Sequence, residues 1–396
     1  MKSVISTETK PIKMWLNDID AEALSQARNL ANLPFIYKHV AIMPDAHCGY
    51  GMPIGGVLAT TDAVIPNAVG VDIGCGMCAV RTSLTEIDKE SLKTLLGSPK
   101  EKRGIRGRVP VGFKHHERAQ DESYMPDTAP LENVQNSRVM QLYQAAKKQV
   151  GTLGGGNHFI EIQHGDDNHI WIIIHSGSRN IGLQIARHYN QLAIKLNERW
   201  KTSVPRKWDL AFLPLNTSEA SNYLAEMQFC VEFALANRKL MMERVQQAIE
   251  EVVGSVQYEP LINIAHNYAA VENHFNEHVI VHRKGATRAR TGDMGIIPGS
   301  QGSSSYIVVG KGNPESFSSC SHGAGRVLGR KQAQRTLDLE AEQSRLDELG
   351  IIHGMRSKRD LDEAPSAYKN IDRVMENQQD LVDIAVRLKP LAVVKG

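Results

Sequence analysis

The sequence has little of what marks secreted or membrane-spanning proteins. Its 396 residues include only five cysteines and 6% aromatic residues, and the formal net charge is +2. A small, odd number of cysteines argues against a disulfide framework and favours a reducing compartment. No apolar run is long enough to cross a bilayer, and residues 1–7 lack the apolar core of a signal peptide. We therefore expect a cytoplasmic protein with free thiols and no membrane partner.

The composition is otherwise that of an ordinary globular chain, with 41% hydrophobic and 23% charged residues. Because the net charge is near neutral, the chain as a whole has no strong positive field that would indicate a nucleic-acid partner. Local basic clusters do occur at 102–108, 283–290 and 326–335. Helical and strand patterns are interspersed without regular alternation, and no repeat or linker divides the chain. The sequence predicts an α+β fold: one large domain over residues 1–396, with central sheets flanked by helices and a metal site at strand ends.

The spacing of apolar residues predicts individual elements. Helices are expected at 20–33, 133–150, 181–200, 221–253, 327–337, 337–348 and 371–388. Strands are expected at 35–43, 262–266, 279–283 and 306–309, with a hairpin formed by 157–162 and 169–175. The apolar stripe within 221–253 is interpreted as core. Residues 97–132 are polar and poorly periodic, which indicates an exposed excursion.

His322 lies at the centre of the most distinctive stretch, between Gly/Ser-rich sequence and a segment of helical character. The glycines at 323 and 325 allow close approach of a ligand. A helix beginning just beyond would direct free N–H groups toward an anion and would place Arg326 and Arg330 on one face. The pattern suggests phosphate chemistry. A helix-capping loop with a structural histidine is the alternative.

Ligand-type residues are scattered along the chain, each at an expected strand end or in a glycine-rich loop. They are Asp72, Cys75, His158, His175 and His266. Such positions can converge at one edge of a sheet, and a thiolate can bridge two ions. Each histidine taken alone is better explained as a structural residue than as a ligand, and it is their number in such positions that argues for a site. The Cys75–Cys78 pair has no second CxxC to complete a zinc site.

Several motifs, in order along the whole chain, resemble those of the RtcB family, the GTP-dependent RNA-splicing ligases. The matching segments are 43–47, 70–76, 151–161, 175–179, 266–268, 283–286, 297–300, 320–326, 367–369 and 393–396. The resemblance implies an enzyme that joins an RNA 3′-phosphate or 2′,3′-cyclic phosphate to a 5′-hydroxyl. His322 would attack GTP to form GMP-histidine, and the GMP would then activate the RNA 3′ end.

The resemblance also implies site residues. Two Mn²⁺ ions would be held by Asp72, Cys75, His158, His175 and His266, with Cys75 shared. GTP would be bound by Asn157, His158, Phe159, Ile160, Glu161, His266, Asn267, Pro298, Gly299, Ser300, Gln301, Ser305, His322, Gly323, Ala324, Gly325, Tyr368 and Lys395. The residues that would bind phosphates or RNA are Arg179, Lys284, Arg326 and Arg330.

Two points of chemistry are awkward for this assignment. Thiolate and imidazole ligands favour zinc over manganese on softness. Strand periodicity places Asn157 and Glu161 on one face and His158 on the other, so a bulge near Gly156 or access from both faces is needed. Cys48 and Cys78 receive no role.

Other functions stay open on the sequence alone. A dinuclear phosphoesterase would use the same ligands to activate water, and a non-catalytic relative would only bind RNA. The physiological RNA, which could be transfer RNA, ribosomal RNA or a damaged end, is not specified. The oligomeric state and the need for an archease-like activator are not specified either.

Overall fold

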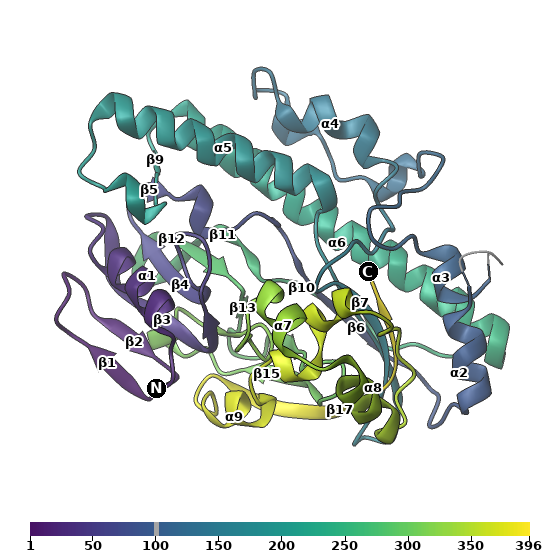
Figure 1. The fold of residues 1–396 in the computed structure, drawn as a ribbon. Coiled ribbons are helices and arrows are strands. Elements are labelled where there is room, and N and C mark those ends of the chain that lie inside the picture. Colours follow the sequence, from purple (N-terminus) through teal and green to yellow (C-terminus); the bar gives the residue numbers. More distant parts are fainter. Residues whose placement is uncertain (99–102) are drawn as a thin grey trace.

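Two large β-sheets form the framework of the computed structural model, which describes residues 1–98 and 103–396 (Figure 1). The first residue of the predicted basic cluster at 102–108 and part of the predicted excursion lie outside the described residues. The predicted α+β fold is confirmed. Within the described part of the chain, no helix combines the length and apolar character needed to cross a membrane.

The first sheet has six strands and is antiparallel except where β2 runs parallel to β3. Its order is β1 (Ser3–Ile5), β2 (Ile12–Met14), β3 (Ile36–His47), β4 (Ile54–Thr60), β12 (Glu277–Lys284) and β11 (Asn267–His274).

The second sheet has seven antiparallel strands. Its order is β10 (Ile262–Ala265), β6 (Gly76–Arg81), β8 (Ile170–Ser176), β7 (Phe159–Gly165), β17 (Val382–Lys395), β15 (Ser305–Gly310) and β14 (Met294–Ile297). The edge strands β10 and β14 contact each other, so this sheet curls almost into a barrel. Two short ladders pair β13 (Ala286–Arg288) with β16 (Ser319–Ser321) and β5 (Ala63–Val64) with β9 (Leu213–Pro214).

Helices cover the outside of the sheets (Figure 1). They are α1 (Ala21–Ala31), α2 (Lys89–Leu96), α3 (Gly104–Arg108), α4 (Arg138–Ala146), α5 (Arg179–Trp200), α6 (Ser218–Val253), α7 (Arg330–Thr336), α8 (Leu339–Glu348) and α9 (Ile371–Glu376). The Thr217 hydroxyl caps α6 by accepting from the Ala220 amide at 3.3 Å, and Gly254 ends the helix at φ 87°. The predicted apolar stripe of α6 is buried in two core clusters, which confirms its interpretation as core.

The predicted helix at 371–388 is wrong beyond Glu376. Residues 382–395 form β17, which lies between β15 and β7 in the second sheet. Val382, Ile384, Val386 and Leu388 repeat every second residue, which is the period of a strand. Because β17 pairs on both sides, its backbone groups are satisfied by the sheet rather than by a helix.

Two further predictions need correction. The helix expected from residue 327 begins only at Arg330, so Arg326 lies outside it and the two arginines do not share a helix face. The excursion at 97–132 is not wholly exposed, since Ile105 of α3 and Val109 are fully buried beneath α6.

Strand register brings the chemically interesting chain segments to one edge of the second sheet. Phe159 pairs with both His175 and Lys395, and Gly76 pairs with Ser176 and with Ala265. The ends of β10, β6, β8, β7 and β17 therefore meet at this edge. His266 is the only residue between β10 of the second sheet and β11 of the first, so the same edge adjoins the junction of the two sheets.

Candidate active site

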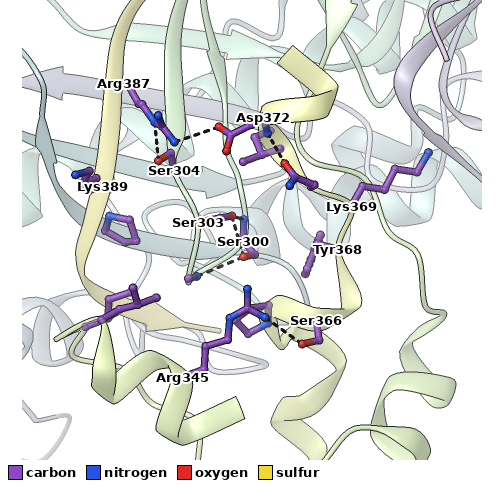
Figure 2. A pocket seen from close by; sticks show the side chains of 17 residues that line it. Ser300, Ser303, Ser304, Arg345, Ser366, Tyr368, Lys369, Asp372, Arg387 and Lys389 are labelled. Carbon is purple, nitrogen blue, oxygen red and sulfur yellow. Dashed lines mark hydrogen bonds and ion pairs between the residues drawn. The ribbon is translucent and has the colours of Figure 1, made fainter. Parts of the chain in front are cut away.

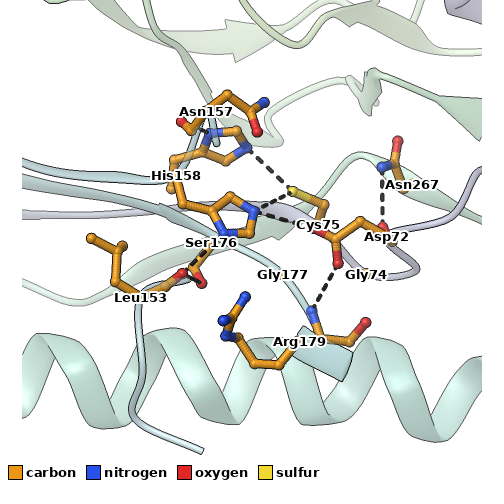
Figure 3. Close-up of polar contacts among 12 residues, drawn as sticks. Asp72, Gly74, Cys75, Leu153, Asn157, His158, Ser176, Gly177, Arg179 and Asn267 are labelled. Carbon is orange, nitrogen blue, oxygen red and sulfur yellow. Dashed lines mark hydrogen bonds and ion pairs between the residues drawn. The ribbon is translucent and has the colours of Figure 1, made fainter. Parts of the chain in front are cut away.

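Five side chains converge at the junction of the two sheets, as Figure 3 shows for Asp72, Cys75 and His158. One group of ligand atoms comes from Cys75, His175 and His266, and a second from Asp72, Cys75 and His158. Within each group the ligand atoms lie no more than 4.8 Å apart. Cys75 belongs to both groups, with its Sγ 3.3 Å from His175 Nε2 and 3.6 Å from His158 Nε2. This arrangement fits two cations that share one thiolate.

Backbone carbonyls orient two of the imidazoles. His158 Nδ1 donates to the Leu153 carbonyl at 2.9 Å, and His175 Nδ1 donates to the Asn157 carbonyl at 3.1 Å. A proton held on Nδ1 leaves the Nε2 lone pair directed at Cys75, which is the tautomer that a metal ligand needs. Burial, and then the neighbouring imidazoles, hold the pKa of His175 well below its ordinary value, so that ring is neutral.

His266 supplies a direct test of whether the cluster suits a cation. Its ring is 3% exposed, and Nδ1 has no hydrogen-bond partner among the described residues. Burying a polar atom without a partner costs about 1–3 kcal/mol, and a bound cation would remove that cost if it were ligated there. Burial, together with the nearby imidazoles, lowers the pKa of His266 well below its ordinary value, so its lone pair is available. The residues fit a metal centre.

The Asp72 loop is held by contacts from both sheets. The Asn267 amide donates to the Asp72 carbonyl at 3.1 Å, and the Ser178 amide donates to Asp72 Oδ1 at 3.2 Å. Asp72 Oδ2 lies 3.1 Å from His158 Nε2. Gly177 is required here because a Cβ at that position would lie 2.2 Å from Asp72 Oδ1.

The loop before β7 removes the periodicity difficulty. Asn157 and His158 precede the strand, and Gly154 and Gly156 adopt positive φ values of 92° and 74°. The chain therefore turns irregularly at this point, and no strand alternation connects His158 with Glu161. The Arg179 guanidinium packs against Gly154, where an added Cβ would lie 2.1 Å from it.

His322 is aimed by a buried carboxylate that the sequence analysis did not single out. His322 Nδ1 donates to Asp45 Oδ2 at 2.7 Å, and the same oxygen accepts from the His322 amide at 3.1 Å and the Gly323 amide at 3.3 Å. Burial by itself raises the pKa of Asp45, but the imidazole outweighs it and the net pKa is lowered. The ionised Asp45 keeps the proton on Nδ1, which leaves Nε2 with a free lone pair.

The His322 ring also faces the cluster of candidate ligands and a cavity. Its centroid lies 4.8 Å from that of His266. The residues that line the cavity are His47, Ile54, Asn157, Phe159, Glu161, His175, Pro298, Gly299, Ser300, Gln301, His322, Gly323, Ala324, Gly325, Arg326, Arg330, Glu363, Tyr368 and Lys395. Most of the predicted GTP-site residues are among them. Ile160, Asn267 and Ser305 do not line it, and His158 and His266 belong to the ligand cluster instead.

Glu161 is a buried carboxyl in this cavity. Burial raises its pKa to about 7, although Lys395 and the Gln163 side-chain amide act to lower it. Gln163 Nε2 donates to Glu161 and also to Ser305 Oγ at 3.2 Å. Ser305 therefore contacts Gln163, which in turn contacts the cavity residue Glu161, and it does not line the cavity itself.

Glu363, which also lines the cavity, is surrounded by cationic groups. Its carboxylate lies 3.0 Å from Arg330, 3.2 Å from Arg326 and 3.1 Å from Lys395, and it accepts from the Tyr368 hydroxyl at 2.5 Å. Burial alone would raise its pKa, but Lys395 and Arg330 hold the net pKa below the ordinary value.

The other two predicted phosphate contacts, Lys284 and Arg179, do not line the cavity. Lys284 Nζ donates to the carbonyls of Tyr50 at 2.6 Å and Asn67 at 3.0 Å, and burial lowers its pKa to about 7. Arg179 donates to Thr152 Oγ1 at 3.1 Å, close to His158 (Figure 3). Cys78 lies in the core with its thiol directed at the Arg238 carbonyl, away from the ligand cluster.

Helix α6 supplies two supporting residues that were missed. The Asn237 amide donates to the carbonyl of Gly177 at 3.1 Å and accepts from the Gly151 amide at 2.7 Å. The Arg238 guanidinium donates to the carbonyls of Gly74 at 3.0 Å and Ser176 at 2.9 Å. Both are buried polar residues inside an otherwise apolar helical pattern, and that contrast is the only signal that the sequence offers.

Fold and site together define a class: α+β proteins with a candidate two-cation centre at the junction of two sheets, beside a cavity that presents a carboxylate-oriented histidine. The chain belongs to the RtcB family, whose model, described as tRNA-splicing ligase RtcB, matches residues 26–396. The chain is 39% identical to RNA-splicing ligase RtcB of Escherichia coli K12, with 99% of each chain covered. It is 35% identical to tRNA-splicing ligase RtcB of Nanoarchaeum equitans (98% and 95% covered) and 32% identical to that of Thermococcus kodakarensis (94% and 91%).

Proposed function

We propose that this chain, acting as a single domain over residues 1–396, is an RNA ligase that serves RNA splicing or repair. It would join RNA 3′-phosphate ends, or 2′,3′-cyclic phosphate ends after water has opened the ring to a 3′-phosphate, to 5′-hydroxyl ends, with GTP as the activating nucleotide. The names of the relatives support RNA ligation. The observation that carries the chemistry is the short contact from His322 Nδ1 to buried Asp45, which leaves Nε2 as a nucleophile facing the cavity.

The proposed reaction has three displacements. His322 Nε2 attacks the α-phosphorus of GTP, forms a P–N bond and breaks the bond to the bridging oxygen, so pyrophosphate leaves. An oxygen of the RNA 3′-phosphate attacks the same phosphorus, and the P–N bond breaks to return the electron pair to His322. The 5′-hydroxyl then attacks the RNA phosphorus, loses its proton to solvent and expels GMP.

The residues in and around the cavity have different roles in this proposed reaction. Asp45 keeps His322 in the nucleophilic tautomer and stabilises positive charge on the ring as the P–N bond forms. Arg326 and Arg330 are held at the cavity by Glu363 and can exchange that carboxylate for phosphate oxygens. The five ligand residues would hold two divalent cations, proposed as Mn²⁺, which neutralise phosphate charge when bound.

The test is guanylylation of the purified protein with α-labelled GTP and Mn²⁺ or Zn²⁺. We expect an acid-labile, alkali-stable adduct in the native chain and none in His322→Ala. His47→Ala is the matched control, because His47 lines the same cavity but is not the proposed nucleophile. An adduct that survives His322→Ala would refute the assignment. Turnover of phosphate esters without GTP would favour a phosphoesterase instead.

A further inference from the structure

A second hollow adjoins the cavity of His322 and shares Ser300 and Tyr368 with it. Its volume is about 550 Å³, which is within the range of small-ligand sites. The wall is built from α8 and the residues just after it, from η7 (Pro365–Ala367) through the start of α9, from the 300–304 turn and from β17. None of the reaction steps above uses the residues that are peculiar to this hollow.

Cationic side chains border the hollow at two ends: Arg387 and Lys389 lie at one end and Arg345 lies at the other (Figure 2). Arg345 donates to Ser366 Oγ at 3.3 Å, and neither Arg345 nor Lys389 has a carboxylate at ion-pair distance among the described residues. Arg387 pairs with Asp372 at 3.1 Å, but both side chains are about half exposed, and such pairs contribute little. Lys369 Nζ donates to the Ala46 carbonyl at 2.7 Å, so it is not one of the groups available to an anion. The hollow therefore presents three groups available to an anion.

Apart from Asn370 and from Asp372, which pairs with Arg387, the remaining wall is apolar or carries hydroxyl groups. Leu349, Ile351, Pro365 and Pro390 supply the apolar surface. Arg387 donates to Ser304 Oγ at 3.0 Å, and the Ser303 hydroxyl lies 2.9 Å from that of Ser300 (Figure 2). Phosphate requires cationic and hydroxyl donors, whereas a sugar and base require an apolar face. A hollow that offers both fits a nucleotide.

We propose that this hollow holds a nucleotide of the RNA strand, with the backbone phosphates on its two sides at Arg345 and at Arg387 and Lys389. The inference rests on the proposed function and extends it by placing part of the strand that leads to the reacting end. A polymer is favoured over a free nucleotide because the hollow and the His322 cavity share a rim at Ser300 and Tyr368. A strand whose end lies at His322 can continue over that rim.

The experiment measures binding rather than ligation, so it does not depend on the proposed reaction. Fluorescence anisotropy would follow a labelled oligoribonucleotide with a 3′-phosphate, over a range of salt, in the full chain and in Arg345→Ala/Lys389→Ala. We expect weaker binding and a salt slope smaller by about 0.7 for each lost single-strand contact. The control is Arg199→Ala/Lys239→Ala, which removes two exposed cations on α5 and α6. Unchanged RNA affinity, or an equal loss in the control, would overturn the proposal.

Two further measurements identify the occupant. Titration with inorganic pyrophosphate tests the other phosphate source, and a loss of pyrophosphate affinity with RNA affinity intact would assign the hollow to the leaving group and refute the proposal. Photo-crosslinking from 4-thiouridine upstream of the 3′ end should reach residues 345–351 or 387–390. Crosslinks confined to other segments would also refute it. If the native chain forms no GMP adduct yet the RNA results hold, the reaction proposal alone fails.

Discussion

At the scale of single residues, the ligand-type side chains could be predicted because glycines and expected strand ends surround them. Asp45 and Glu363 could not. Asp45 meets His322 across 277 positions of the chain, and Glu363 meets Arg330 across 33. Nothing local distinguishes these carboxylates from surface ones. Only the tertiary fold shows that each is buried against a cation or an imidazole.

Glu161 carries a prediction about pH. The N1–H and N2–H groups of guanine are adjacent donors that a carboxylate accepts better than a carboxylic acid does. With a pKa of about 7, Glu161 is protonated below pH 7 and ionised above it. We therefore expect guanosine to bind more tightly as the pH rises from about 6 to 8, by up to about tenfold for each unit below the pKa.

Calorimetric titration with guanosine, which carries no phosphate, isolates this effect. Glu161→Gln should bind weakly at every pH and show a flat profile, because the amide does not titrate. Adenosine is the matched ligand control, since it lacks both donors. A native profile that is flat between pH 6 and 8 would be inconsistent with recognition by Glu161.

At the scale of elements, helices α5 and α6 and the β7–β8 hairpin followed from periodicity and turn residues. The errors have physical causes. The strand β17 directly follows the short helix α9 and is specified by its pairing with β15 and β7, and α7 starts late because Gly329 is its N-cap. A strand that pairs on both sides is specified by its neighbours, which a single segment does not reveal.

Helix α6 carries the prediction at this scale, because Asn237 joins the Gly151 loop to the end of β8. Asn237→Ala would leave several buried backbone groups without partners, each costing about 1–3 kcal/mol. We expect a lower melting temperature and weaker divalent-cation binding, measured by calorimetry. Gln247→Ala on the exposed face of α6 is the control and should change neither. Normal cation affinity in a destabilised Asn237→Ala would show that α6 supports the fold but not the centre.

At the scale of the whole molecule, the ligand set spans the loop before β6, the loop before β7, the end of β8 and the β10–β11 junction. A cation that binds only the folded chain stabilises it by mass action, about 2.7 kcal/mol at a hundredfold excess over Kd. We expect Mn²⁺ or Zn²⁺ to raise the melting temperature of the native chain and a chelator to reverse the rise. Cys75→Ala should lose most of the effect, because both groups share that thiol.

Cys48→Ala serves as the control for this measurement, since Cys48 lies outside the ligand cluster. It should respond to cations like the native chain. If neither Mn²⁺ nor Zn²⁺ changes the melting temperature of the native chain, the two-cation assignment is contradicted. A larger rise with Zn²⁺ than with Mn²⁺ would follow the softness of the ligands.

The connection through His266 has an evolutionary consequence. One residue is the entire link between β10 and β11, so the chain between the two sheets has no spare length. Surface loops can lengthen or shorten while the strands they join stay in place, but an insertion here would rotate the imidazole away from Cys75 or shift one sheet past the other. Descendants of this chain should therefore tolerate length variation in the surface loops but not at the junction between β10 and β11.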